Sequence, residues 1–402
     1  MKPRRRVLVI ARYFWPATND DTMRLFHWIQ YLRSQGAEAV VATPRWHRSW
    51  PRSLVVEGIV VRRIDHPPTH ALRWGRYARQ LGQWSATEAG EFDAIYLDSL
   101  EAESSAILSL PEMQRLPVMV RYGCRPAPEQ THASPTALQT SSSSPSQSSS
   151  PSIDNKTLAL LRRASVVLAA DAVSQRQLLA AGINKSAVVR TPQSYGSCYD
   201  RSTQARSRAR QILSDANHDL FARSQDRVVV CPGELTREWH IMQLIQQLAP
   251  LLESNRALRL WLLGDGPARS AVYETLRHEG LHRMVALPGL FTDMQEIFQA
   301  ADLCLFPAPG LGLGWLLPTC VRSGVPLLAS DSSEARRQLG ASANDLLYTA
   351  AQPLALRQQV AQWLKHPAPL SQRVEEARQQ LLRDNPACVG LDPLFSSLEA
   401  TA

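Results

Sequence analysis

Short apolar runs alternate with helix-like segments through the first half of the chain. The run RRRVLVIARYF is followed by a helical pattern from about Thr22 to Gln35, and then by Gly36 and the run AEAVVATP. Further apolar runs occupy residues 93–98, 117–123, 164–171 and 186–192. Apolar strands that alternate with helices indicate βαβ units and a parallel sheet. We therefore predict one doubly wound α/β domain over residues 1–195.

The same alternation starts again in the second half of the chain. Its strand-like runs are RVVVCPG, LRLWLLGDG, MVALPG, DLCLFPAPG and VPLLASD, at residues 227–233, 258–266, 284–289, 302–310 and 325–331. They predict a second domain of the same type over residues 227–385, joined to the first by a polar helical linker at 196–226.

A serine-rich segment interrupts the first series. Residues 134–152 read SPTALQTSSSSPSQSSSPS and offer almost no side chain that could be buried. The conformational entropy of such a segment is not offset by packing, so we expect a disordered insertion at about 126–155. It is either a modified or partner-binding loop or a tolerated surface expansion.

Composition limits the classes that this protein can belong to. The chain has 402 residues, 44% of them hydrophobic, and a formal net charge of +8. No run of 18 apolar residues predicts a membrane span, and Val7–Ala11 is too short for the core of a signal peptide. Six cysteines lack metal-like or paired spacing. We expect a cytoplasmic protein with no metal or cofactor, and no nucleic-acid partner, because neither a zinc finger nor an RNA-binding aromatic motif is present.

The stretch LGLGWLLPTCVRSGVP, residues 311–326, reads as a glycine-rich turn that opens a helix ending at Gly324. It belongs to an ordered series of motifs: Gly233 and Leu235, then Gly264 to Pro267, Pro288 with Gly289, Ala301 with Asp302 and Pro307, Gly312 with Gly314, and Gly324 with Pro326, Ser330 and Asp331. This order resembles the GT-B glycosyltransferases of the retaining family-4 type, and the similarity covers most of the chain.

The resemblance implies two Rossmann-like domains that face a cleft, with a last helix near Pro393 to Glu399, within a tail at 386–402, returning to the first domain. It also implies transfer of a hexose from a nucleotide sugar to a glycan or lipid-linked acceptor without a metal. In that family an Arg and a Lys stabilise the leaving diphosphate, and the aligned positions here are Glu234 and Trp239. Losing two charge-assisted bonds of about 1.5–3 kcal/mol each weakens donor binding by roughly 10²–10⁴. Arg237 and His240 are near enough in sequence to replace them in part.

Two glutamates that the family places eight residues apart are also replaced. One contacts the donor sugar and the other the ribose, and here they are Leu311 and Thr319. Leucine accepts no hydrogen bond, and threonine offers one neutral bond in place of a charged pair. The family histidine of the first domain has no clear counterpart either.

The main chain of the donor site is retained. We expect an open site lined by Gly233, Gly264, Gly266, Gly312 and Gly314, where N–H groups at a helix start favour an anion. Alternatively, these glycines serve only tight turns. In the first domain the family's Gly-Gly is replaced by Asn19-Asp20-Asp21. An Asp there caps the following helix, and its carboxylate fills space that a phosphate needs.

These substitutions leave enzymatic activity undecided. The first hypothesis is a strongly diverged or inactive nucleotide-sugar-dependent transferase. The alternative is a pseudo-glycosyltransferase that binds a glycan or a partner protein.

Residues 69–84, THALRWGRYARQLGQW, predict an amphipathic helix. Trp74, Tyr77, Leu81 and Trp84 recur at helical spacing, flanked by Arg73, Arg76 and Arg79. Such a helix can lie on anionic lipid, which places the protein at the inner face of the membrane and predicts an exposed Trp74, Tyr77 and Trp84 edge. Alternatively, its aromatic side chains pack on the sheet.

Overall fold

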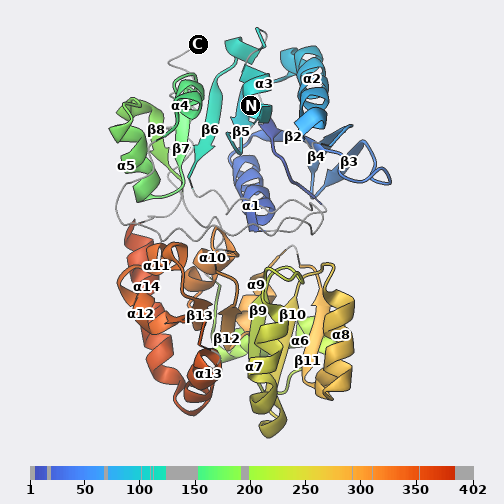
Figure 1. Cartoon of the computed structure of the whole chain (residues 1–402), viewed down its shortest axis with the longest axis vertical. Helices are drawn as coiled ribbons and strands as arrows, with labels where there is room; N and C mark the ends of the chain where they lie inside the picture. Colours follow the sequence, from blue (N-terminus) through green and yellow to red (C-terminus); the bar gives the residue numbers. More distant parts are fainter. Residues whose placement is uncertain are drawn as a thin grey trace, which may run out of the picture. The chain divides into compact units, whose positions relative to one another are not determined.

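The computed structural model describes residues 5–15, 20–67, 71–100, 102–108, 110–111, 113–123, 153–191, 199–291, 293–309, 311–352 and 354–384. Within these residues the chain forms two compact units, each built on its own sheet (Figure 1). The predicted α/β class with two mostly parallel sheets is confirmed.

The first unit contains an eight-stranded sheet in the order β3-β4-β2-β1-β5-β6-β7-β8. All neighbours are parallel except β3 and β4, which pair antiparallel. The strands are β1 (Arg6–Ile10), β2 (Glu38–Pro44), β3 (Ser53–Val56), β4 (Ile59–Ile64), β5 (Ala94–Leu97), β6 (Val118–Tyr122), β7 (Val166–Ala169) and β8 (Val188–Arg190). The helices are α2 (Ala71–Glu88), α3 (Ala102–Leu108), α4 (Asn155–Leu161) and α5 (Ala172–Ala180).

The second unit contains a six-stranded parallel sheet in the order β11-β10-β9-β12-β13-β14. Its strands are β9 (Arg227–Pro232), β10 (Leu258–Leu263), β11 (Val285–Gly289), β12 (Leu303–Phe306), β13 (Leu327–Ser330) and β14 (Leu347–Tyr348). Its helices are α6 (Thr203–Ala216), α7 (Ile241–Ser254), α8 (Arg269–His278), α9 (Gln295–Ala300), α10 (Leu316–Arg322), α11 (Ser333–Leu339), α12 (Ala343–Leu346), α13 (Ala355–Lys365) and α14 (Pro367–Asp384). Short 3-10 turns, such as η4 (His218–Leu220), join several elements.

The central strands of both sheets, such as β1, β5, β9 and β12, are apolar and buried because helices cover them. In the second unit, Val228, Val229 and Val230 of β9 are at most 1% exposed. The helix α6 packs beside α9, and α13 packs on α7 (Figure 1). This burial is what near-continuous hydrophobic runs in a parallel sheet predict.

Three boundaries differ from those that the sequence predicted. Residues 13–15 and 20–31, including most of α1 (Asp20–Ser34), belong to the second unit and not to the first. The described part of the predicted linker, 199–226, is also part of the second unit, since Ala209 and Leu213 of α6 lie in its core. Ile153 to Asn155, expected at the end of the insertion, lead into α4, where the Asp154 carboxylate accepts from Thr157 N. The rest of the insertion and the tail at 386–402 lie outside the described residues.

Candidate functional site

The predicted donor-site residues gather at the carboxyl edge of the second sheet. Gly233 follows β9, Gly264 follows β10, and Gly312 with Gly314 lies between β12 and α10. The strands β10, β9 and β12 are parallel neighbours, so their ends meet at one edge, where open α/β sheets usually bind ligands. The candidate donor-site glycines named from the sequence therefore lie at one edge of the sheet.

At this edge the glycines allow segments of the protein to approach one another closely. A Cβ on Gly264, whose φ is +111°, would lie 1.6 Å from the carbonyl oxygen of Gly233. A Cβ on Gly266 would lie 2.5 Å from the carbonyl oxygen of Leu235. Leu235 N donates to the Asp265 carbonyl at 3.0 Å, which holds the turns after β9 and β10 together. The turns are in direct contact, so tight packing, the alternative kept open above, accounts for Gly264 and Gly266.

The indole of Trp239 fills the space beside two of the other glycines. A Cβ on Gly233 would lie 2.2 Å from its Cζ3 atom, and a Cβ on Gly312 would lie 2.6 Å from its Cη2 atom. Trp239 is only 4% exposed. The expectation of an open site lined by Gly233 and Gly312 is therefore wrong, because a large apolar side chain occupies the position that the family gives to a lysine.

The start of α10 is already bound to an anion of the protein itself. The Asp20 carboxylate accepts hydrogen bonds from Gly314 N at 2.7 Å, Trp315 N at 3.0 Å and Leu316 N at 2.8 Å. These N–H groups have no partner within their own helix, and the helix dipole favours negative charge beside them. Asp20 thus caps α10, a helix almost 300 residues away, whereas the sequence suggested a cap for its own helix.

Two titratable groups of α1 have shifted pKa values beside α10. Burial raises the pKa of Asp20 to about 6. The hydrogen bond from Leu316 N opposes this rise, and the nearby Asp21 carboxylate adds to it. Burial also lowers the pKa of His27 to about 4, against the attraction of the Asp293 carboxylate. The neutral His27 ring stacks on Trp315, with ring centres 4.6 Å apart.

The remaining donor-site candidates do not converge on a charged pocket. Arg237 is exposed, and His240 Nδ1 lies 2.8 Å from Gln243 Oε1 at the start of α7. Leu311 packs against the core of the second unit, and Thr319 is 1% exposed inside α10. Glu234 is half-buried in the turn after β9. The substitutions predicted at positions 234, 239, 311 and 319 therefore place no cation at this edge.

The amphipathic helix α2 of the first unit presents arginines and buries its aromatic face. Arg73 and Arg76 are exposed, Trp74 and Trp84 are half-buried against the core, and Tyr77 is 0% exposed. The predicted exposed Trp74, Tyr77 and Trp84 edge is wrong, because these side chains pack into the first unit. The Arg12 guanidinium covers the Trp74 ring, 4.8 Å from its centre.

The role of Asp20 at α10 and the stack of His27 on Trp315 were missed by sequence reasoning. The sequence signal for Asp20 was an acidic pair where the family has glycines, and only the folded chain shows which helix receives it. In the part of the chain that the structure describes, no helix is both long enough and apolar enough to cross a bilayer.

Comparison with known proteins shows a family match over part of the chain. Residues 226–366 match the model of the family described as glycosyl transferases group 1. EpsD of Bacillus subtilis, which carries the name of a glycosyltransferase, is 28% identical over 162 residues, 40% of this chain and 42% of that protein. An exopolysaccharide phosphotransferase of Streptomyces coelicolor is 30% identical over 106 residues, 26% of this chain and 11% of its own length. The matches thus span less than half of these curated relatives.

Solved structures resemble the chain over nearly its whole length. Sucrose-phosphate synthase from Thermosynechococcus elongatus has a TM-score of 0.67 at 15% identity, covering 99% of this chain and 100% of that one. HepE of Anabaena, solved with UDP and glucose, has a TM-score of 0.62 at 16% identity, covering 98% and 99%. At these identities the likeness shows the fold, which is the predicted GT-B architecture.

Proposed function

The chain belongs, through residues 226–366, to the glycosyl transferases group 1, and on this premise we propose that it is a strongly diverged member without nucleotide-sugar turnover. The observation that carries the proposal is the Asp20 carboxylate on the three N–H groups at the start of α10. A donor diphosphate would meet this carboxylate in place of a free anion site.

Charge at the same edge supports the proposal. A leaving diphosphate needs positive groups close to it in the transition state. The family positions for these groups hold Glu234 and the buried indole of Trp239. Two negative side chains, Asp20 and Glu234, and no cation at the family's own positions disfavour both binding and departure of the diphosphate.

The retained architecture supports a binding role for the inactive protein. One relative is named as an exopolysaccharide phosphotransferase, and HepE was solved in complex with UDP and glucose. We therefore propose a glycan as the ligand of this pseudo-glycosyltransferase. The acceptor of an active ancestor, a glycan or a lipid-linked sugar, has this chemistry.

We also propose contact with an anionic membrane surface, through arginine side chains alone and without inserted aromatic side chains. The exposed arginines of α2, Arg73, Arg76 and Arg79, would attract anionic lipid, while the buried Tyr77 supplies no inserted aromatic. Binding to anionic vesicles should therefore be weak and disappear at high salt.

An activity assay with a panel of UDP-sugars and GDP-sugars tests the proposal. We expect neither transfer to glycan acceptors nor hydrolysis above the rate without protein. Hydrolysis of a nucleotide sugar that is abolished by Arg237→Ala would establish an active enzyme instead, with the exposed Arg237 in the role of the missing cations.

A further inference from the structure

A pocket lies at the amino edge of the second sheet. Arg227 opens β9, Asp302 immediately precedes β12, and Pro326 immediately precedes β13. These strands are parallel neighbours, so their first residues share the amino edge, opposite to the edge that holds Gly233 and Gly312. The pocket has a volume of about 220 Å³.

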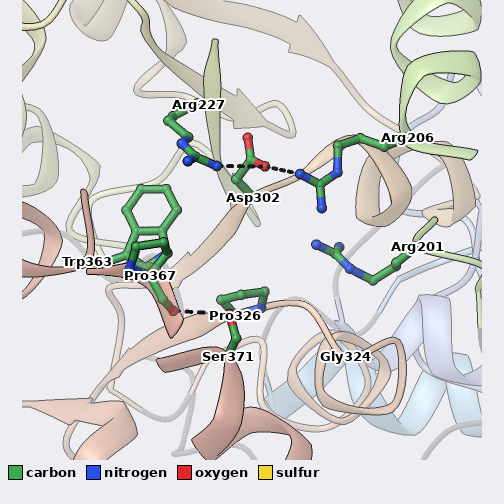
Figure 2. Close-up of a pocket in the computed structure, with 9 residues that line it drawn as sticks. All are labelled: Arg201, Arg206, Arg227, Asp302, Gly324, Pro326, Trp363, Pro367 and Ser371. Atoms are coloured by element: carbon green, nitrogen blue, oxygen red, sulfur yellow. Dashed lines mark hydrogen bonds and ion pairs between the residues drawn. The ribbon is translucent and has the colours of Figure 1, made fainter. Parts of the chain in front are cut away.

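Three guanidinium groups point into this pocket. Figure 2 shows Arg206 and Arg227 directed toward Asp302 from two sides, with Arg201 below Arg206 and Trp363 below Arg227 in this view. The helices α6 and α13 supply Arg206 and Trp363, and Ser371 comes from α14. Several elements of one unit thus build a single hollow, so its shape does not depend on one loop.

The single carboxylate in the pocket already has its full set of close partners. Asp302 is 5% exposed. Its Oδ1 accepts from Arg206 at 2.7 Å, and its Oδ2 accepts from Arg210 at 2.7 Å and from Val228 N at 2.8 Å. The next carboxylate, Asp226, accepts from Arg259 and from Arg223 N. Asp302 is therefore neutralised within the protein before Arg201 and Arg227 are considered.

Arg201 and Arg227 leave an excess of positive charge. The Arg201 guanidinium donates to the carbonyl oxygens of Phe298 and Ala301, which are neutral groups. Arg227 lies 4.0 Å from Asp302 and has a side chain that is 45% exposed. Burial and then the nearby Arg206 lower the pKa of Arg201, as expected where cations are crowded. An anion that entered would relieve this repulsion.

We propose that this pocket binds a small phosphorylated anion, held by Arg201 and Arg227 beside the Arg206–Asp302 pair. Guanidinium groups bind phosphate oxygens through two parallel N–H bonds, which makes arginine the side chain best suited to this ligand. The volume lies below the roughly 300–1,000 Å³ of sites for drug-sized ligands, so the ligand is small. A phosphate ion or a short phosphate ester fits this description.

Calorimetric titration of the full chain with inorganic phosphate, at constant ionic strength set with chloride, tests the site. We expect saturable binding by the wild type and an affinity loss of about tenfold or more in Arg227→Gln, because one charge-assisted contact is removed. Arg227 is half exposed, so this variant should fold normally. The matched control is Arg373→Gln, whose side chain is 47% exposed and also pairs with carboxylates, and it should bind as the wild type does.

Two further arms identify the source of the phosphate and separate this site from the donor edge. Glycerol 3-phosphate is titrated in the same way. It should bind with higher affinity than inorganic phosphate if the natural ligand is a phosphate ester, and with no higher affinity if the ligand is the free ion. The phosphate binding that depends on Arg227 should keep its affinity in Asp20→Asn, because Asp20 lies at the opposite edge. Absence of saturable binding in the wild type, or equal affinity in Arg227→Gln, would overturn the proposal whatever the outcome of the sugar-transfer assay.

Discussion

In the proposed function, the side chain of Asp20 stands where a bound phosphate would be expected. Free N–H groups at a helix start attract an anion, whether it is a phosphate or a carboxylate. Where the family has a glycine pair, this chain has an acidic pair, and one member reaches Gly314, Trp315 and Leu316. On the proposed function, the anion at this helix start is part of the protein and does not dissociate.

The opposed pKa shifts of Asp20 and His27 predict how stability depends on pH. The raised pKa of Asp20 makes the free energy of unfolding fall as pH rises from about 4 to about 6. The lowered pKa of His27 makes it rise from about pH 4 to about pH 6.5. The two effects have opposite signs over the same pH range, so in wild type they offset each other in part.

Substituting either group should reveal the slope of the other. Urea unfolding between pH 4 and 6.5 should show stability rising with pH in Asp20→Asn and falling with pH in His27→Gln, each relative to wild type. Slopes that stay parallel to the wild-type slope in both variants would mean that neither group titrates as described.

Substituting Gly312 tests whether the Trp239 indole fills the site. Gly312→Ala combines a strained φ of +70° with a Cβ 2.6 Å from Trp239. Gly36→Ala, at φ +89° with no atom within 4 Å, is the matched control for strain alone and should cost about 1–2 kcal/mol. We expect a further loss of about 1–3 kcal/mol for Gly312→Ala in urea unfolding. In a Trp239→Phe background this extra loss should disappear, and its persistence would exclude the indole as its cause.

At the scale of elements, α6 illustrates why a polar segment can be structural. Its buried Arg210 donates to the carbonyls of Arg223, Asp226 and Ala300 and to the Asp302 carboxylate. A buried charge with several hydrogen bonds ties the helix to the start of the sheet. The polar composition of α6 is typical of a linker, but the helix is packed as part of the second unit.

Removing the Arg210 guanidinium should destabilise the second unit. Arg210→Ala leaves the nearly buried Asp302 with fewer donors, which we expect to cost about 3–5 kcal/mol. Arg208→Ala, an exposed arginine of the same helix, should change stability by less than about 0.5 kcal/mol. Thermal denaturation of the two variants measures the difference, and a similar Tm in both would show that the buried network contributes little.

Elements with strong apolar patterns were predictable from sequence, and exceptions have identifiable causes. The runs at 227–233 and 258–266 became β9 and β10 because buried parallel strands are continuously apolar. The hairpin of β3 and β4 was missed, since its turn places Glu57 at φ 48° before Gly58. Glutamate is not among the residues that signal such a turn.

For the whole molecule, motif order predicted the fold but not the state of the site. Glycine spacing located Gly233, Gly264 and Gly312 at one sheet edge, because backbone turns are encoded locally. The Asp20 carboxylate lies 294 residues before Gly314, and the Trp239 indole meets Gly312 only in the folded chain. Sequence indicated that the charges were missing, whereas the filling of the site depends on contacts between distant segments.

The central claim is that Asp20 and Trp239 occupy the place of a donor diphosphate. Calorimetric titration with UDP tests this claim most directly. It compares the wild type with a triple variant that carries Asp20→Gly, Glu234→Arg and Trp239→Lys. We expect millimolar affinity or none in wild type, and a gain of roughly 10²–10⁴ in the variant, because restored cations contribute charge-assisted bonds. Turnover should still need Leu311→Glu and Thr319→Glu. Micromolar binding of UDP by the wild-type protein would contradict the account.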